Sequence, residues 1–270
     1  MCELFAMSSR IPTAVTYSLE EFSKNGSKLR RNRDGWGIAL ARDRDAFLVK
    51  EPEPANDSVW VRFIADHAFE TTLAIAHVRY ATRGQHTMEN THPFRRALGR
   101  RTHLFAHNGT LNGIEQAVDR GGLSYLPIGD TDSELAFCQL LTRLKPHYDG
   151  DEVPTVDTRF DLFSGICEEM KGLGASNFLY YDGDILFAHA HKRMYDQAGE
   201  LAGPKPPGLQ IKKCWTCAYQ KAVTCPGLNV GLPDHQTVLL ASVPLDDRGW
   251  EELAEGTVLA LKDGEIIKQA

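Results

Sequence analysis

The sequence predicts an α+β fold built in layers, and the arrangement of its apolar segments carries that prediction. Short apolar runs typical of strands occur in clusters, and segments with helical spacing lie between the clusters. Strands and helices therefore do not alternate one by one, as they would in a single parallel sheet. With 270 residues, of which 42% are hydrophobic and 24% charged, the chain has enough apolar material for a large core.

The individual elements follow from the same patterns. The apolar runs predict strands over residues 3–7, 37–41, 46–50, 73–78, 103–106, 177–181, 185–189, 237–242 and 258–261. Helical spacing predicts helices over residues 19–24, 58–68, 131–144 and 158–171. The third is the clearest, because Thr131 or Asp132 can cap its first turn. Prolines predict surface loops over residues 51–56 and 197–208.

Charge and composition argue against several classes of protein. The formal net charge is −6, from 30 basic and 36 acidic side chains, whereas nucleic-acid binders usually carry a basic surplus. No apolar run approaches the ~18 residues of a membrane span. Residues 1–10 lack the basic and apolar regions of a signal peptide. We therefore expect a cytoplasmic protein with reduced cysteines that binds neither nucleic acid nor membrane.

Three of the six cysteines, Cys214, Cys217 and Cys225, lie close together in the sequence. With His235 they could form a zinc site, but their spacing is irregular and a second Cys-x-x-Cys pair is missing. We predict thiols at these positions, no metal site, and no cofactor.

The first candidate for chemistry is Cys2, which follows Met1 directly. Removal of Met1 would place a thiol and a free α-amine on the same residue. The α-amine has a reference pKa near ~8, so it can take the proton of the thiol at neutral pH. Taken alone, Cys2 could equally be a small residue at the start of a buried strand.

Three further clusters each allow a functional and a structural interpretation. Arg79 at a strand end could bind a carboxylate with two parallel hydrogen bonds, or be an ordinary surface arginine. Asn108 and Gly109 offer an amide and an unobstructed N–H that could form an oxyanion hole, or a simple turn. Asp132 lies in a segment that also suits a helix cap.

The order of these clusters resembles the class II glutamine amidotransferases, which are N-terminal-nucleophile hydrolases, and most closely their stand-alone YafJ-like subgroup. Cys2 is followed by DGWG at residues 34–37, HVRYATRG at 77–84, ENTHPF at 89–94, HNG at 107–109 and DTDSE at 130–134. Two positions depart from the family pattern: Tyr80 stands for a common tryptophan and Arg83 for a common histidine.

The resemblance implies a four-layer αββα sandwich and a catalytic domain over residues 1–270, with its motifs within 2–134. It implies that Cys2 attacks the side-chain amide of glutamine, forms a γ-glutamyl thioester and releases ammonia. It also implies an oxyanion hole at Asn108 and Gly109. In the same way, Arg79 would bind the α-carboxylate and Asp132 the α-ammonium of the substrate, with Thr82 beside it.

Several functions stay open at this point. Because 270 residues are nearly used up by such a domain, we expect no fused synthase. The chain could deliver ammonia to a separate synthetase, or hydrolyse a γ-glutamyl amide and release an amine. From another class, it could be a non-catalytic glutamine- or γ-glutamyl-binding regulatory protein that kept the pocket. The joint presence of Cys2, Arg79, Asn108, Gly109 and Asp132 favours the enzyme.

Overall fold

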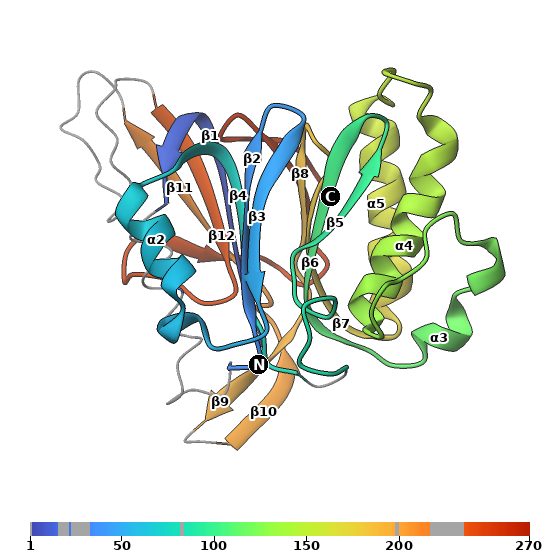
Figure 1. Cartoon of the computed structure of the whole chain (residues 1–270), viewed down its shortest axis with the longest axis horizontal. Coiled ribbons are helices and arrows are strands. Elements are labelled where there is room, and N and C mark those ends of the chain that lie inside the picture. The colour runs from blue at the N-terminus through green and yellow to red at the C-terminus, as the bar shows by residue number, and fades with distance from the viewer. Residues whose placement is uncertain (1, 16–21, 23–32, 82–83, 198–199, 217–234) are drawn as a thin grey trace.

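A computed structural model of the chain describes residues 2–15, 22, 33–81, 84–197, 200–216 and 235–270. Two antiparallel sheets lie face to face between outer helices (Figure 1). The first sheet has seven strands, in the spatial order β13-β11-β12-β1-β4-β2-β3. These are β1 (Glu3–Ala14), β2 (Trp36–Arg42), β3 (Asp45–Glu51), β4 (Glu70–Val78), β11 (Gln210–Thr216), β12 (His235–Ala241) and β13 (Trp250–Glu252).

The second sheet has six strands, in the order β15-β14-β8-β7-β6-β5. These are β5 (Phe94–Leu98), β6 (Arg101–Leu111), β7 (Gly174–Tyr181), β8 (Leu186–His189), β14 (Val258–Lys262) and β15 (Glu265–Gln269). A separate hairpin pairs β9 (Arg193–Gln197) with β10 (Glu200–Lys205). Among the described residues the α-helices are α2 (Val59–His67), α3 (Ile114–Ala117), α4 (Asp132–Leu144) and α5 (Val156–Lys171), and short 3-10 helices cover Ala55–Asp57, Arg120–Gly122 and Lys145–His147.

Three apolar clusters hold the four layers together. Between the two sheets, side chains such as Leu4 of β1 meet side chains such as Leu104 of β6. The opposite face of the seven-stranded sheet buries Phe5 against α2. The opposite face of the six-stranded sheet buries Phe105 against α4 and α5. Because successive residues of a strand point to opposite faces, each central strand contributes to two of these clusters. The predicted αββα sandwich is confirmed.

Local capping explains where the main helices begin. The Ser58 side chain accepts the backbone N–H of Trp60 at the start of α2. Thr131 and Thr155 do the same for α4 and α5, accepting from Glu134 and Thr158. Such caps satisfy backbone N–H groups that have no partner within the helix.

The structure confirms most of the predicted elements. Seven of the nine predicted strands fall within observed ones, and the other two, at 185–189 and 237–242, extend one residue beyond β8 and β12. The helices predicted at 58–68, 131–144 and 158–171 are present. Of the helix predicted at 19–24, only Phe22 is described, and its ring packs on Phe5 with centroids 6.0 Å apart.

The surface loop predicted over residues 197–208 was wrong, because β10 forms there and pairs with β9. Proline lacks the N–H that a ladder needs, and the pairing register shifts between Ala202 and Lys205, where Pro204 lies. An exposed two-stranded hairpin tolerates such an irregularity, which is why the prolines did not exclude a strand.

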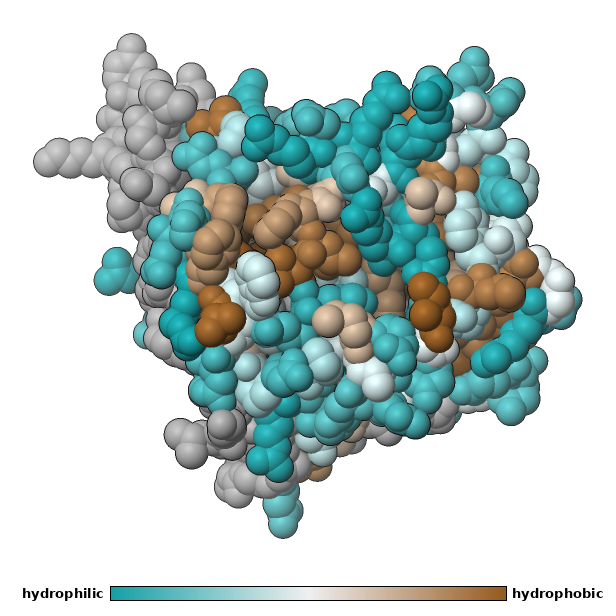
Figure 2. All heavy atoms as spheres, viewed as in Figure 1, coloured by the Kyte–Doolittle hydropathy of each residue, from teal (hydrophilic) through white to brown (hydrophobic). Residues whose placement is uncertain are grey.

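Aromatic side chains remain exposed on the outer layer beside α2. Hydrophobic side chains gather over α2 and the neighbouring strand β3 (Figure 2). Trp60, Phe63 and Phe69 are each more than one third exposed, and the rings of Phe63 and Phe69 lie 6.0 Å apart. In the part of the chain that is described, no helix has both the length and the hydropathy to cross a membrane.

Candidate active site

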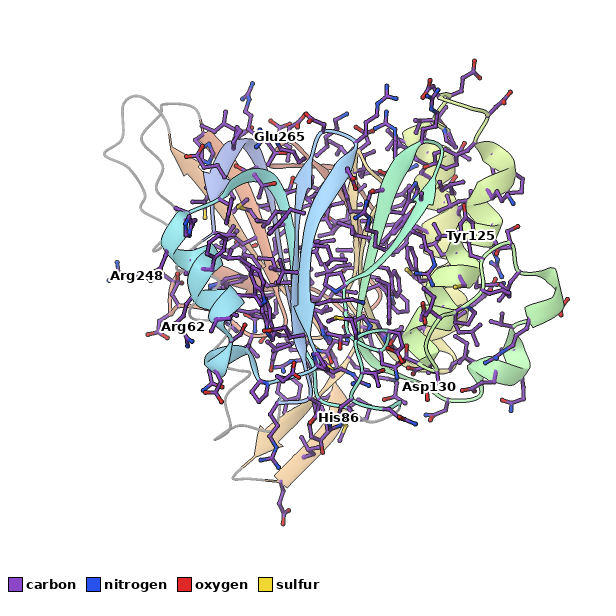
Figure 3. All side chains as sticks on the ribbon, viewed as in Figure 1. Arg62, His86, Tyr125, Asp130, Arg248 and Glu265 are labelled. Atoms are coloured by element: carbon purple, nitrogen blue, oxygen red, sulfur yellow. The ribbon has the colours of Figure 1, made fainter. Side chains whose placement is uncertain are left out.

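The candidate site forms at the end of the sandwich where the N-terminus and the β9–β10 hairpin lie (Figure 1). His86 and Asp130, which belong to predicted motifs or flank them, lie at this end (Figure 3). Glu265 lies at the opposite end (Figure 3). Strand ends and the loops that follow them therefore supply the functional groups, supported by the rigid sandwich.

Strand alternation brings Cys2 and Asn108 into the space between the two sheets. Leu4 points into that space from β1, so Cys2, two residues earlier, lies on the same side. Leu104 and Ala106 point into it from β6, and Asn108 continues their row. Two residues 106 positions apart in the sequence thereby face one another across the sheets.

The Cys2 thiol lies against the backbone just beyond β4. Its Sγ accepts the N–H of Tyr80 at 3.2 Å and lies 3.3 Å from the Tyr80 carbonyl oxygen. Burial raises the pKa of the Cys2 thiol, although the Tyr80 N–H and the positive charge of Arg79 act in the opposite direction. The thiol is therefore mostly protonated at neutral pH, and a base must remove its proton before it can attack.

Asn108 is fully buried and its main chain is fixed. Asn177 Nδ2 donates to the carbonyl oxygen of Asn108 at 2.8 Å, and Asn177 Oδ1 accepts the N–H of His191 at 2.8 Å. The Asn108 side-chain amide contacts Ser242 Oγ, with Nδ2 at 3.0 Å. Its Oδ1 is buried and has no hydrogen-bond partner among the described residues.

Gly109 is required by the close approach of β6 and β7. A Cβ atom at this position would lie 1.8 Å from the carbonyl oxygen of Ala175. No other residue fits without separating the strands. The glycine therefore keeps the chain beside Asn108 in close register with β7.

One cavity of about 420 Å³ joins these groups. Cys2, Asn108 and Gly109, the three residues that the sequence analysis named as candidate nucleophile and oxyanion hole, all line it. The rest of its described lining comes from the ends of β4, β6 and β7 and from the hairpin region: Tyr80, Thr110, Asn112, Gly174, Ala175, Lys192, Met194, Leu201 and Pro204. Its volume is in the range of roughly 300–1,000 Å³ that accommodates small-molecule ligands.

Arg79 follows β4 directly and is buried, but it does not line this cavity. Its Nη1 donates to the carbonyl oxygens of Gln85 at 3.0 Å and Asp34 at 3.4 Å. Its charge lowers the pKa of Cys2, so the guanidinium is close enough to act on the thiol electrostatically. The Arg79 guanidinium therefore lies near Cys2 but is bonded to backbone carbonyl oxygens of neighbouring loops.

Asp132 is the first residue of α4 and also lies outside the cavity lining. Its Oδ2 accepts the N–H of Leu111, at the end of β6, at 2.7 Å. Its Oδ1 accepts the N–H of Ser133 at 2.9 Å. The carboxylate thus ties the start of α4 to the strand that carries Asn108, a structural contact that the sequence did not predict.

Several predicted positions fall outside the described residues. They are Met1, Thr82, Arg83, Cys217 and Cys225. The prediction of reduced cysteines agrees with the free thiols of Cys2, Cys138 and Cys167. It was wrong for Cys214, which is disulfide-bonded. Within the described ranges, no group of three or more histidine, cysteine, aspartate or glutamate side chains is arranged to hold a metal ion.

Sequence reasoning missed the groups that surround the nucleophile and the amide. Tyr80 acts through its backbone, which has no signature of residue type. Ser242 is 134 residues from Asn108, and only the pairing of β12 with β1 brings it near. Met194 and Leu201 come from the hairpin that was predicted as a loop.

Comparison with known proteins assigns this arrangement to a class. The family model of class II glutamine amidotransferases matches residues 1–270, so the chain belongs to that family. Escherichia coli YafJ is 33% identical over 196 residues, which cover 72% of this chain and 75% of that protein. An uncharacterised protein of Methanocaldococcus jannaschii is 32% identical over 272 residues, covering 99% of this chain and 71% of that protein.

The fold comparison agrees with the family. A crystal structure of a predicted glutamine amidotransferase from Pseudomonas aeruginosa PA01 superimposes with a TM-score of 0.69 and 27% identity. The match covers 99% of this chain and 100% of that one. The four-layer sandwich is therefore that of the N-terminal-nucleophile hydrolases.

Proposed function

We propose that this chain is an N-terminal cysteine amidohydrolase that cleaves the γ-amide of glutamine or of a γ-glutamyl compound. One observation carries the proposal: Cys2, Asn108 and Gly109 line the same cavity. A nucleophile beside two groups that can donate hydrogen bonds is the arrangement that acyl transfer requires. A regulatory protein that only binds the ligand would not need the thiol there.

The reaction follows from these groups. Once Met1 is removed, the α-amine of Cys2 takes the thiol proton, and Sγ bonds to the amide carbon. The negative charge that develops on the carbonyl oxygen is stabilised by donors from Asn108 and Gly109. The C–N bond then breaks, and the leaving nitrogen takes the proton and departs as ammonia or an amine. Water hydrolyses the γ-glutamyl thioester, which restores the thiol.

Arg79 and Asp132 are proposed to recognise the α-carboxylate and the α-ammonium of the γ-glutamyl group. A zwitterion needs one cation and one anion, and both residues lie next to strands that bound the cavity. In the structure both groups are satisfied by neighbouring backbone, so the ligand would share or replace those contacts. Because a carboxylate accepts several hydrogen bonds, Asp132 retains capacity for an ammonium donor.

This pair gives the experiment that tests the proposed function. We expect Arg79→Ala or Asp132→Asn to lower kcat/KM by ~10–150-fold, because each removes one charge-assisted hydrogen bond of ~1.5–3 kcal/mol. Arg79→Lys should recover only part of the loss, because an ammonium lacks the planar fork of the guanidinium. Wild type should also prefer a γ-glutamyl substrate with a free α-amine over its Nα-acetylated form, and Asp132→Asn should reduce that preference.

Asp130 provides the matched comparison. It lies two residues before Asp132, and its charge acts on Arg79. If Asp130→Asn, rather than Asp132→Asn, removes the preference for the free α-amine, the ammonium site belongs to Asp130. If wild type cleaves both substrates equally well, the α-group assignment is wrong.

The shape of the cavity favours one form of this activity, the release of an amine with an apolar group. The hairpin wall presents Met194, Leu201 and Pro204 to the space beside Cys2. These side chains offer no hydrogen bond to ammonia, whereas they can pack against an alkyl or aromatic substituent. The other form of the activity is the release of ammonia to a separate synthetase. In that case no part of the substrate would pack against the hairpin wall.

A substitution in the hairpin wall distinguishes the two forms. We expect Leu201→Glu to lower kcat/KM for a γ-glutamyl anilide by ~10–100-fold relative to kcat/KM for glutamine, because loss of apolar contact is worth ~1–3 kcal/mol. Leu126→Glu is the matched control, because Leu126 is 67% exposed and does not line the cavity. An unchanged ratio of the two values in Leu201→Glu would favour release of ammonia.

A further inference from the structure

Ser242 contacts Asn108 but takes no part in the reaction steps proposed above. It follows β12 directly and is buried between the sheets. Its Oγ accepts the backbone N–H of Leu4 at 3.1 Å, and it lies 3.0 Å from the side-chain amide nitrogen of Asn108. The N–H of Ser242 also donates to the carbonyl oxygen of Leu4 at 3.0 Å. One hydroxyl therefore joins the strand that carries Cys2 to the strand that carries Asn108.

The hydrogen bond to Ser242 is compatible with two orientations of the Asn108 amide. With Nδ2 toward Ser242, the hydroxyl accepts from both Leu4 and Asn108, and the buried Oδ1 has no partner among the described residues. An amide turned by 180° has nearly the same shape, and its nitrogen and oxygen are told apart only by their partners. In the turned orientation the Ser242 hydroxyl donates to Oδ1 and still accepts from Leu4.

Only the turned orientation suits an oxyanion hole. It puts Nδ2, with its two N–H donors, where the unpartnered oxygen would otherwise lie. The unturned orientation would present a carbonyl-type oxygen to the negative charge that forms on the substrate, and two acceptors repel each other. The Asn108 main chain is held by Asn177, so rotation of the amide is the remaining freedom that must be fixed.

We propose that Ser242 is a positioning residue, whose hydroxyl donates to Asn108 Oδ1 and turns the amide N–H groups toward the cavity. This inference rests on the proposed function, because it assigns Asn108 to the oxyanion hole. The same oxygen accepts the N–H of Leu4, two residues from Cys2. Ser242 therefore holds the Asn108 amide and the strand that carries Cys2 in a fixed position relative to each other.

A matched control for a purely structural role lies in β1, the strand that pairs with β12. Ser8 of β1 is also buried, and its Oγ accepts one backbone N–H, that of Gly264, at 3.2 Å. Ser8→Ala and Ser242→Ala each remove an acceptor for one backbone N–H. Only Ser242→Ala removes a partner of Asn108.

The test uses two reactions of Cys2 in the full chain. The first is ammonia release from L-glutamine, which passes through an oxyanion. The second is alkylation by iodoacetamide, located on the Cys2 peptide by mass spectrometry, which displaces iodide and forms no oxyanion. We expect Ser242→Ala to lower kcat for the first reaction by ~10–100-fold with little change in KM, because the donor remains but is no longer oriented. The alkylation rate should stay within about twofold, and Ser8→Ala should change neither.

Further variants separate the possible failures. In the double variant Asn108→Ala with Ser242→Ala, kcat should fall no further than in Asn108→Ala alone. If the losses of kcat in the two single variants multiply in the double variant, the positioning role is overturned. It is also overturned if Ser242→Ala lowers the glutaminase rate and the alkylation rate equally. If Ser242→Ala does not fold, Ser242→Cys keeps the size of the side chain with a weak donor and should show the same selective loss of kcat. If Asn108→Ala itself has full activity, the oxyanion assignment has failed, and the positioning role that rests on it fails with it; a loss of kcat in Asn108→Ala with wild-type kcat in Ser242→Ala overturns the positioning role alone.

Discussion

Cys2→Ala is expected to lower kcat for hydrolysis of glutamine or a γ-glutamyl amide by at least ~10⁴-fold while the protein remains folded. No other described thiol can replace it, because Cys138 and Cys167 are buried in the helical layer. Cys2→Ser should lose nearly as much activity, because a hydroxyl ionises far less readily than a thiol. Alanine and serine are both small, so we expect Met1 to be removed and the α-amine to be free in both variants.

The measurement needs one control of folding and one of processing. Cys167→Ala removes a buried thiol from α5, away from the cavity, and should leave kcat within about twofold of wild type while lowering the free energy of unfolding. Mass spectrometry of the active wild-type protein should show a chain that begins at Cys2. Turnover near the wild-type rate in Cys2→Ala would exclude the thiol mechanism, and full activity in a chain that keeps Met1 would exclude the α-amine as base.

Because the pKa of the Cys2 thiol is raised, the activity that Cys2→Ala is expected to abolish depends on a base that removes the thiol proton. The thiol is not ionised in advance, because burial disfavours the thiolate more than the Tyr80 N–H and Arg79 favour it. A thiol with a lowered pKa would attack without help, and the amine would then matter little. In the proposed mechanism the α-amine of Cys2, freed by removal of Met1, would take the thiol proton.

The central strands were predictable from sequence because they are buried on both faces and therefore form continuous apolar runs. Leu4 and Phe5 of β1, for example, are both buried and face opposite clusters. Strands at or near sheet edges were missed. β15 alternates half-buried and exposed residues, so its apolar signal is weak. β11 buries Lys212, whose charge is paired with Asp246 at 2.6 Å, and a buried lysine is not expected from sequence.

The candidate site could be predicted only to the extent that its proposed chemistry depends on residue type. Cys2, Asn108 and Gly109 were identified from motifs, and the cavity brings them together. The contacts of Asp132 with the N–H of Leu111 and of Cys2 with the backbone of Tyr80 could not be predicted, because any residue can supply a backbone group. Ser242 was missed for a different reason: its role arises from pairing between β12 and β1, which are over 220 residues apart.

Asn108→Ala is expected to lower kcat by ~10²–10³-fold, with a much smaller change in KM. The amide is proposed to donate to the oxyanion, which exists only at and around the transition state, so its loss should appear in kcat rather than in binding. Asn108 is fully buried, and its removal also leaves Ser242 without one partner. A thermal unfolding curve measured beside the kinetics separates that structural loss from the chemical one.

An isosteric change gives the sharper form of this prediction. Asn108→Asp keeps the shape of the side chain and can still accept the Ser242 hydroxyl, but it replaces the donor with a carboxylate. A negative charge beside a developing oxyanion is repulsive, so kcat should fall at least as far as in Asn108→Ala. Because the Cys2 thiol is untouched, alkylation by iodoacetamide should still label it in both variants. Equal kcat in Asn108→Asp and wild type would mean that the amide does not face the oxyanion, and that Gly109 and other backbone N–H groups stabilise it without Asn108.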